Sequence, residues 1–132
     1  MEKQNINPGE NIEKPKTKFL LIDDHKAIVE GSRFYFDDID GFTAVECHTV
    51  KEALEAILEH LPKTLLLDHN LTFGGAEGLE IARILREKHP DIKIYSTTIN
   101  NDEETLGEYK KLGISRVGKE NLDDMKALMK RG

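Results

Sequence analysis

The sequence predicts an α/β fold in which helices cover both faces of a doubly wound parallel sheet. Short, continuous apolar runs end in acidic residues, as at residues 19–22 before Asp23 and residues 64–67 before Asp68. Strands that are buried on both faces have this pattern. Stretches with apolar residues at helical spacing fill the intervals between such runs. This alternation is typical of right-handed βαβ units in one sheet.

The first half of the chain predicts two βα units. The strand at residues 19–22 is followed by a helix over residues 27–36, and the mixed, β-leaning residues 42–47 predict an edge strand. Thr49 and Glu52 have the spacing of a capping box at the start of a second helix. One face of that helix is expected in the core, with Val50, Ala53, Leu54, Ile57, Leu58 and Leu61.

The second half repeats the pattern three times. Strands are expected at residues 64–67 and 92–97, with a weaker one at residues 116–118. A helix follows each of them; the second starts after Asn101, with Glu104 at its third position, and the last starts after Asn121. Their apolar stripes are expected to pack in the core: Leu79, Ala82 and Leu85, then Leu106, Tyr109 and Leu112, then Leu122, Met125 and Met129.

Composition excludes several classes of protein. The 132 residues are 38% hydrophobic and 33% charged, as expected for one globular domain. A net charge of -6 argues against broad binding of nucleic acid by this domain. No apolar stretch approaches the ~20 residues of a membrane span, and the N-terminal residues contain no signal-peptide core. The single Cys47 rules out an internal disulfide and fits the cytoplasm.

Residues 1–16 are polar and are expected to form a disordered N-terminal arm, which leaves residues 17–132 as the folded domain.

In a doubly wound sheet, ligands bind at the carboxyl ends of the strands. The acids Asp23, Asp24 and Asp68, the hydroxyl of Thr98 and the ammonium of Lys119 follow predicted strands. The neighbouring Thr97 is the alternative to Thr98.

These side chains predict a site for Mg²⁺ and a phosphoryl group. Three carboxylates at one edge repel one another unless a cation lies among them. Mg²⁺ prefers oxygen ligands, typically one or two carboxylates, waters and a phosphate oxygen. A lysine and a threonine can then contact the phosphoryl oxygens, and phosphoryl transfer needs little beyond positioning and charge neutralisation.

The residues that carry a family resemblance are 20–25 (LLIDDH), 65–68 (LLLD), Thr98 and Lys119. Together they resemble the receiver domain of bacterial two-component response regulators, which is CheY-like, over about residues 18–130. The opening motif, followed by Glu30 and Gly31, is most similar to receivers that precede helix-turn-helix transcription domains. The resemblance implies a flavodoxin-like, five-stranded sheet in the order 2-1-3-4-5.

The resemblance also implies the role of each site residue. Asp68 would accept the phosphoryl group, while Thr98 and Lys119 would contact it. Mg²⁺ would be held by Asp23, Asp24, Asp68 and the backbone carbonyl of Asn70. Such a domain catalyses only its own phosphorylation and dephosphorylation.

The partners implied are a histidine kinase or a phosphotransfer protein, and an output domain or protein downstream. A step in a phosphorelay is included, and a homodimer is possible. No membrane partner is expected.

Four features depart from the family pattern. Leu71 and Thr72 replace the usual Met-Pro, in a loop (residues 71–78) that is about two residues longer than usual. Ile99 follows Thr98, where the family has Ala or Gly, and is expected to narrow access to Asp68. Arg116 or Val117 stands where the family has a switch aromatic. Glu120, instead of Pro, follows Lys119.

Two other functions stay open from sequence. A pseudo-receiver would bind partner proteins independently of phosphorylation, and the four departures motivate this alternative. A Mg²⁺-dependent phosphatase with an aspartyl nucleophile is disfavoured, because Asn70 occupies the position where such enzymes have a second acid.

Overall fold

The computed structural model describes residues 17–99 and 102–131 of the chain. The predicted arm and Asn101 lie outside the described residues. Five parallel strands form one sheet in the order β2-β1-β3-β4-β5, as predicted. They are β1 (Phe19–Asp23), β2 (Phe42–Glu46), β3 (Thr64–Leu67), β4 (Lys93–Ser96) and β5 (Ser115–Arg116). The helices are α2 (Lys26–Tyr35), α3 (Val50–His60), α4 (Glu77–Lys88), α5 (Glu103–Lys111) and α6 (Leu122–Arg131).

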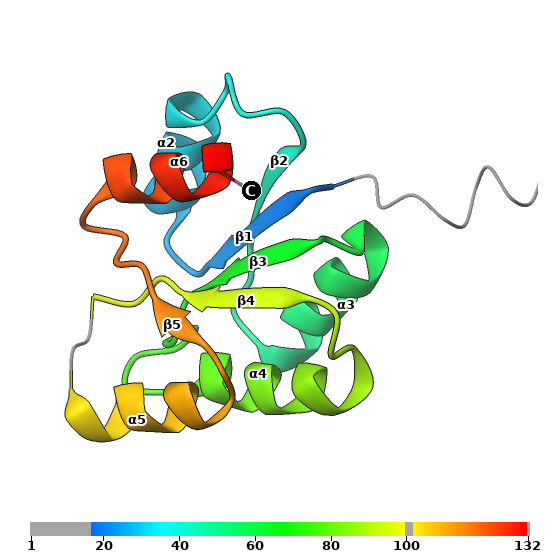
Figure 1. The fold of residues 1–132 in the computed structure, drawn as a ribbon, viewed down its shortest axis with the longest axis vertical. Coiled ribbons are helices and arrows are strands. Elements are labelled where there is room, and N and C mark those ends of the chain that lie inside the picture. Colours follow the sequence, from blue (N-terminus) through cyan, green and yellow to red (C-terminus); the bar gives the residue numbers. More distant parts are fainter. Residues whose placement is uncertain (1–16, 100–101, 132) are drawn as a thin grey trace, which may run out of the picture.

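The helices cover both faces of the sheet, with α2 and α6 on one face and α3, α4 and α5 on the other (Figure 1). Side chains alternate along each central strand. Leu20, Ile22, Leu65 and Leu67 pack on the side of α3, α4 and α5. Phe19, Leu21 and Leu66 pack with the buried Val29 of α2 and Met125 and Met129 of α6. The continuous apolar runs of β1 and β3 are therefore explained by burial on both faces.

The predicted helix starts are largely confirmed. Thr49 Oγ1 accepts the amide of Glu52 at 3.0 Å at the start of α3. The Glu52 carboxylate, however, accepts the amide of His48 at 2.7 Å, one residue before the partner that a reciprocal capping box would use. Asn121 Oδ1 accepts the amide of Asp124 at 3.2 Å at the start of α6. Asp102 is the N-cap of α5 and accepts the amide of Thr105, so this helix begins at Glu103, one residue later than predicted.

Two predicted core residues of α3 are not in the core. Leu58 is 55% exposed and Leu61 is 48% exposed. Leu61 ends the helix in a left-handed conformation, with φ of 45°, so the helical periodicity no longer decides where its side chain points. Leu58 lies at the margin of a buried face that is narrower than the apolar stripe, since Ala53, Ala56 and Ile57 are the buried residues.

The last two strands end earlier than predicted. β4 ends at Ser96, so Thr97 and Thr98 follow it, and β5 ends at Arg116, three residues before Lys119. Backbone pairing nevertheless continues past both ends. The amide of Val117 donates to Ser96 O at 2.8 Å and that of Lys119 donates to Thr97 O at 2.9 Å. This pairing brings Lys119 to the carboxyl end of the sheet.

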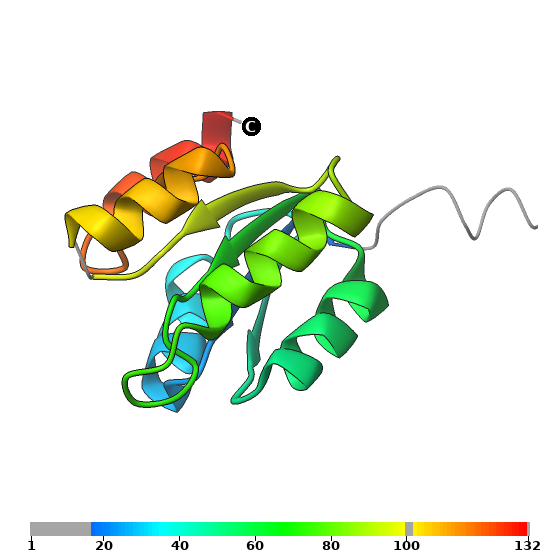
Figure 2. The same cartoon turned by 90° about the horizontal axis from the view of Figure 1, so that it is seen from below.

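The loops that follow β1, β3 and β4 meet at this end. The segment between β3 and α4 forms an extended bend beyond the strand (Figure 2). Gly74 has φ of 73° there, a conformation that favours glycine. No helix of the described part of the chain is long and apolar enough to cross a membrane.

Candidate functional site

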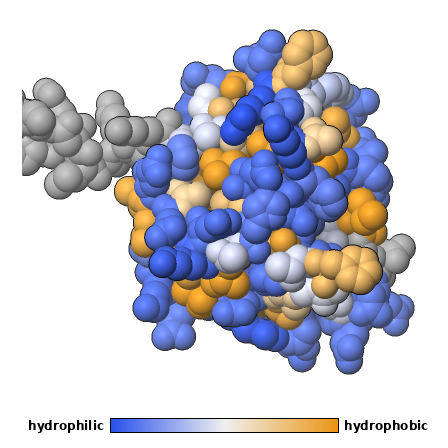
Figure 3. Space-filling view, turned by 180° about the vertical axis from the view of Figure 1, so that it is seen from behind, coloured by the Kyte–Doolittle hydropathy of each residue, from blue (hydrophilic) through white to orange (hydrophobic). Residues whose placement is uncertain are grey.

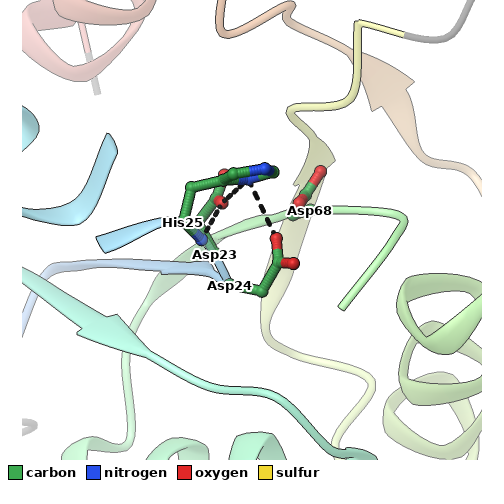
Figure 4. A group of neighbouring side chains, drawn as sticks. All are labelled: Asp23, Asp24, His25 and Asp68. Atoms are coloured by element: carbon green, nitrogen blue, oxygen red, sulfur yellow. Dashed lines mark hydrogen bonds and ion pairs between the residues drawn. The ribbon is translucent and has the colours of Figure 1, made fainter. Parts of the chain in front are cut away.

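Three carboxylates and an imidazole lie together where β1 and β3 end. One ligand atom from each of Asp23, Asp24, His25 and Asp68 lies within 4.8 Å of the others. Asp23 ends β1 and Asp68 follows β3; these strands are neighbours in register, and the amide of Asp68 donates to Ile22 O. His25 Nδ1 lies 3.1 Å from Asp23 Oδ1 and 3.0 Å from Asp24 Oδ1 (Figure 4). The predicted convergence of these acids is confirmed.

Lys119 is the counter-charge of the two buried acids. Its Nζ lies 2.9 Å from Asp23 Oδ2 and 3.2 Å from Asp68 Oδ2. Burial lowers the pKa of Lys119, but the hydrogen bond to Asp23 and the charges of Asp68 and Asp23 outweigh burial and raise this pKa above its ordinary value. Lys119 is therefore charged and holds the ends of β1 and β3 together.

Asp68 is 2% exposed and its protonation is perturbed. Burial raises the pKa of Asp68 from 3.8 to about 6, and the charge of Asp23 adds to the effect, while Lys119 opposes it. Asp68 Oδ1 accepts the amide of His69 at 3.0 Å. A buried carboxylate with a neighbouring acid gains most from an added cation, because the cation favours its charged form.

The donor set fits Mg²⁺. Asp24 Oδ1 and Asp68 Oδ2 are buried and receive no hydrogen bond from the described residues. His25 Nδ1 lies 3.0 Å from Asp24 Oδ1, and Lys119 Nζ lies 3.2 Å from Asp68 Oδ2. Carboxylate oxygens in this state are suitable ligands for a hard divalent cation, which also needs positions for water.

A cavity of about 430 Å³ opens above these acids. Its lining includes the predicted site residues Asp24, Asp68, Asn70, Thr98 and Lys119. Thr98 is among these lining residues and Thr97 is not, which favours Thr98 over the alternative Thr97. The Asn70 side chain donates a hydrogen bond to Gly75 O and so connects the site to the long loop.

Two apolar side chains border this polar cavity. Phe73 is fully exposed and Ile99 is 63% exposed, and both line the cavity. Ile99 lines the same cavity as Asp68, as the prediction that it narrows access to Asp68 requires.

On the molecular face opposite to that of Figure 1, hydrophobic groups are separated by hydrophilic surface (Figure 3).

Sequence reasoning missed three contacts around the site. Tyr109 was expected only to fill the core, but its hydroxyl lies 2.7 Å from Nδ1 of the buried His69. Arg116, one of the two residues considered for the position of the switch aromatic, donates from Nε to Thr98 O at 2.8 Å. His25 Nδ1 lies within ion-pair distance of both Asp23 and Asp24, and its side chain is also exposed to solvent. The polar termini of long side chains give no periodic signal, so none of these contacts could be read from spacing.

Comparison with known proteins identifies the class. The response regulator receiver domain family matches residues 19–128. The chain belongs to this family, whose members are signalling modules, and the resemblance noted in the sequence is confirmed.

Individual relatives agree with this assignment. The chain is 34% identical over 83 residues to the response regulator GacA of Pseudomonas syringae pv. syringae (strain B728a), covering 62% of this chain and 38% of the relative. It is 27% identical over 108 residues to the transcriptional regulatory protein DegU of Brevibacillus brevis, covering 81% of this chain and 45% of that relative. The chain thus spans less than half the length of these relatives.

Solved structures share the fold. A two-component response regulator from Clostridium difficile has a TM-score of 0.73 at 20% identity, covering 87% of this chain and 93% of that one. TrrA from Thermotoga maritima, solved in complex with Mg(2+)-BeF, has a TM-score of 0.69 at 23% identity, covering 87% and 97%.

Proposed function

We propose that this domain accepts a phosphoryl group on Asp68 in a Mg²⁺-dependent reaction and thereby switches protein–protein interactions in two-component signalling. The observation that carries the proposal is the placement of Lys119 Nζ between Asp23 and Asp68, beneath a cavity that Thr98 also lines. One acceptor carboxylate, one cation and one hydroxyl thus face the same space. That is the set needed to bind and neutralise a phosphoryl group.

The reaction is a displacement at phosphorus. An Asp68 carboxylate oxygen forms the new O–P bond, and the P–N bond of a phosphohistidine on the donor breaks. The electron pair of that bond stays on the imidazole, which then takes up a proton. Asp23, Asp24, Asp68 and the backbone carbonyl of Asn70 would hold the metal. Bound Mg²⁺ would neutralise the carboxylates and the phosphoryl oxygens.

The negative charge of the phosphoryl group would determine how Lys119 and Thr98 respond. Lys119 would follow the added negative charge, and Thr98 would donate its hydroxyl to a phosphoryl oxygen. The raised pKa of Asp68, about 6, leaves most of this carboxyl ionised and nucleophilic near pH 7. Because the cation favours the charged form, Mg²⁺ would extend this range to lower pH.

The partners follow from the chemistry. The donor would be a histidine kinase or a phosphotransfer protein, in the cytoplasm. The receiver of the signal would be an output domain or a separate protein; the names of several relatives describe transcriptional regulators. Dimer formation stays a prediction.

The test is the intact mass of the protein after incubation with acetyl phosphate, with and without Mg²⁺. We expect a single phosphate adduct that needs Mg²⁺ and that Asp68→Asn abolishes. The matched control is Asp91→Asn, which should keep the adduct. Asp91 is exposed and precedes the amino end of β4, whereas the site lies at the carboxyl ends of the strands. Absence of an adduct from the wild type, with no Mg²⁺ binding by titration, would favour the pseudo-receiver instead.

A further inference from the structure

A buried hydrogen bond connects the residue after Asp68 to helix α5. The amide of His69 donates to Asp68 Oδ1 at 3.0 Å, and its Nδ1 lies 2.7 Å from the hydroxyl of Tyr109. The two rings meet edge to face, with centroids 5.5 Å apart. His69 is 6% exposed and Tyr109 is 1% exposed. A hydrogen bond between Nδ1 and the hydroxyl therefore joins two side chains that are almost completely buried.

Helix α4 closes the third side of this contact. The amide of Gly78 donates to His69 O at 2.9 Å. A Cβ on Gly78 would lie 2.7 Å from the Cα of His69 and 2.8 Å from the Tyr109 hydroxyl. Close-packed groups of this kind transmit displacement instead of absorbing it. The contacts of His69 with Gly78 and Tyr109 therefore leave it little free space on this side.

Neither Arg116 nor Val117, the two residues considered for the family's switch position, is aromatic. Arg116 is bonded to Thr98 O and to the Glu120 carboxylate, at 2.8 and 2.7 Å. A hollow of about 280 Å³ lies between β5 and α5, and Tyr109 and Arg116 both line it. Tyr109 is thus the buried aromatic residue that links the acceptor site to this side of the molecule.

We propose that Tyr109 is a positioning residue that couples Asp68 to helix α5 through His69. The inference rests on the proposed phosphoryl acceptor function. A phosphoryl group adds up to about two negative charges at the Asp68 carboxylate. The His69 amide, which donates to that carboxylate, responds to the change, and the Nδ1–hydroxyl bond passes it to α5. Because coupling is reciprocal, the state of α5 also affects how readily Asp68 binds the group.

The experiment uses the full chain with Mg²⁺ and beryllofluoride as the phosphoryl mimic. Fluorine NMR reports whether beryllofluoride is bound, and hydrogen exchange reports the protection of residues 103–111. We expect binding to change exchange in α5 by at least about fivefold, the lower end of typical couplings. Tyr109→Phe removes only the hydroxyl and should lose most of this change while still binding beryllofluoride. Tyr95→Phe, a half-buried tyrosine of β4, is the matched control and should respond like the wild type.

A second variant approaches the same bond from the other side. His69→Leu should lose the α5 response as Tyr109→Phe does, and the double variant should lose no more than either. A role limited to fold stability would lower the melting temperature but leave the response of α5 intact.

Three results are informative in different ways. An unchanged α5 response in Tyr109→Phe with beryllofluoride bound would overturn the coupling alone. A wild-type protein that binds beryllofluoride without any change in α5 would do the same. A wild-type protein that binds no beryllofluoride in the presence of Mg²⁺ would overturn the proposed function, and the coupling with it.

Discussion

Replacing Asp68 with asparagine should stabilise the protein near neutral pH. The fold raises the pKa of Asp68 from 3.8 to about 6, mainly by burial. This rise corresponds to ~3 kcal/mol of free energy, by which the fold disfavours the charged carboxyl. The value already includes the opposing effect of Lys119. Because asparagine has the same shape and no charge, Asp68→Asn should be up to about 3 kcal/mol more stable than the wild type at pH 7.5.

The pH dependence follows from the sign of the shift. A carboxyl with a raised pKa in the fold contributes stability that is fully present below pH 3.8 and is lost as the pH rises to about 6. The gap between variant and wild type should therefore open across this window and stay constant above it. Urea unfolding at a series of pH values without Mg²⁺ measures it.

Two additions sharpen this measurement. Saturating Mg²⁺ should stabilise the wild type and narrow the gap, since a ligand at 100 times its Kd contributes about 2.7 kcal/mol. Asp91→Asn should change stability by less than about 0.5 kcal/mol at every pH, as an exposed substitution does. A variant that is less stable than the wild type at pH 7.5, or a gap that does not depend on pH, would refute the reasoning.

Three further substitutions test the fold around the site. Lys119→Met leaves two buried carboxylates without their cation and should cost about 3–5 kcal/mol of stability. The control Lys63→Met, at an exposed position, should cost little. Equal losses of stability in urea unfolding would contradict the role of Lys119. Thr49→Ala removes the acceptor of the Glu52 amide and should cost about 1 kcal/mol of stability. An unchanged urea midpoint would contradict this expectation. Leu66→Ala empties a fully buried position between β3 and the α2 and α6 face, and should cost about 2–5 kcal/mol by thermal unfolding; a loss well below this range would mean that the core collapses around the cavity.

Much of the architecture was predictable because burial leaves a periodic trace in the chain. The apolar runs that precede Asp23 and Asp68 mark strands covered on both faces, and the α3 stripe marks a helix with one buried face. The edge position of β2 was predictable from its mixed pattern. Two core predictions in α3 were wrong for different reasons: Leu61 caps the helix in a left-handed conformation, where the period no longer applies, and Leu58 lies at the margin of a narrow buried face.

The sequence by itself determined the class of fold, the five side chains at the strand ends and the chemistry that they suggest. These depend on residue type and short-range spacing, which can be read directly from the sequence. Only the tertiary structure decided how the side chains are paired: Lys119 with both Asp23 and Asp68, and Tyr109 with His69. Such contacts join residues 40 to 96 positions apart. Their geometry depends on sheet register and helix packing, because a hydrogen bond requires a distance and an angle that no local pattern specifies.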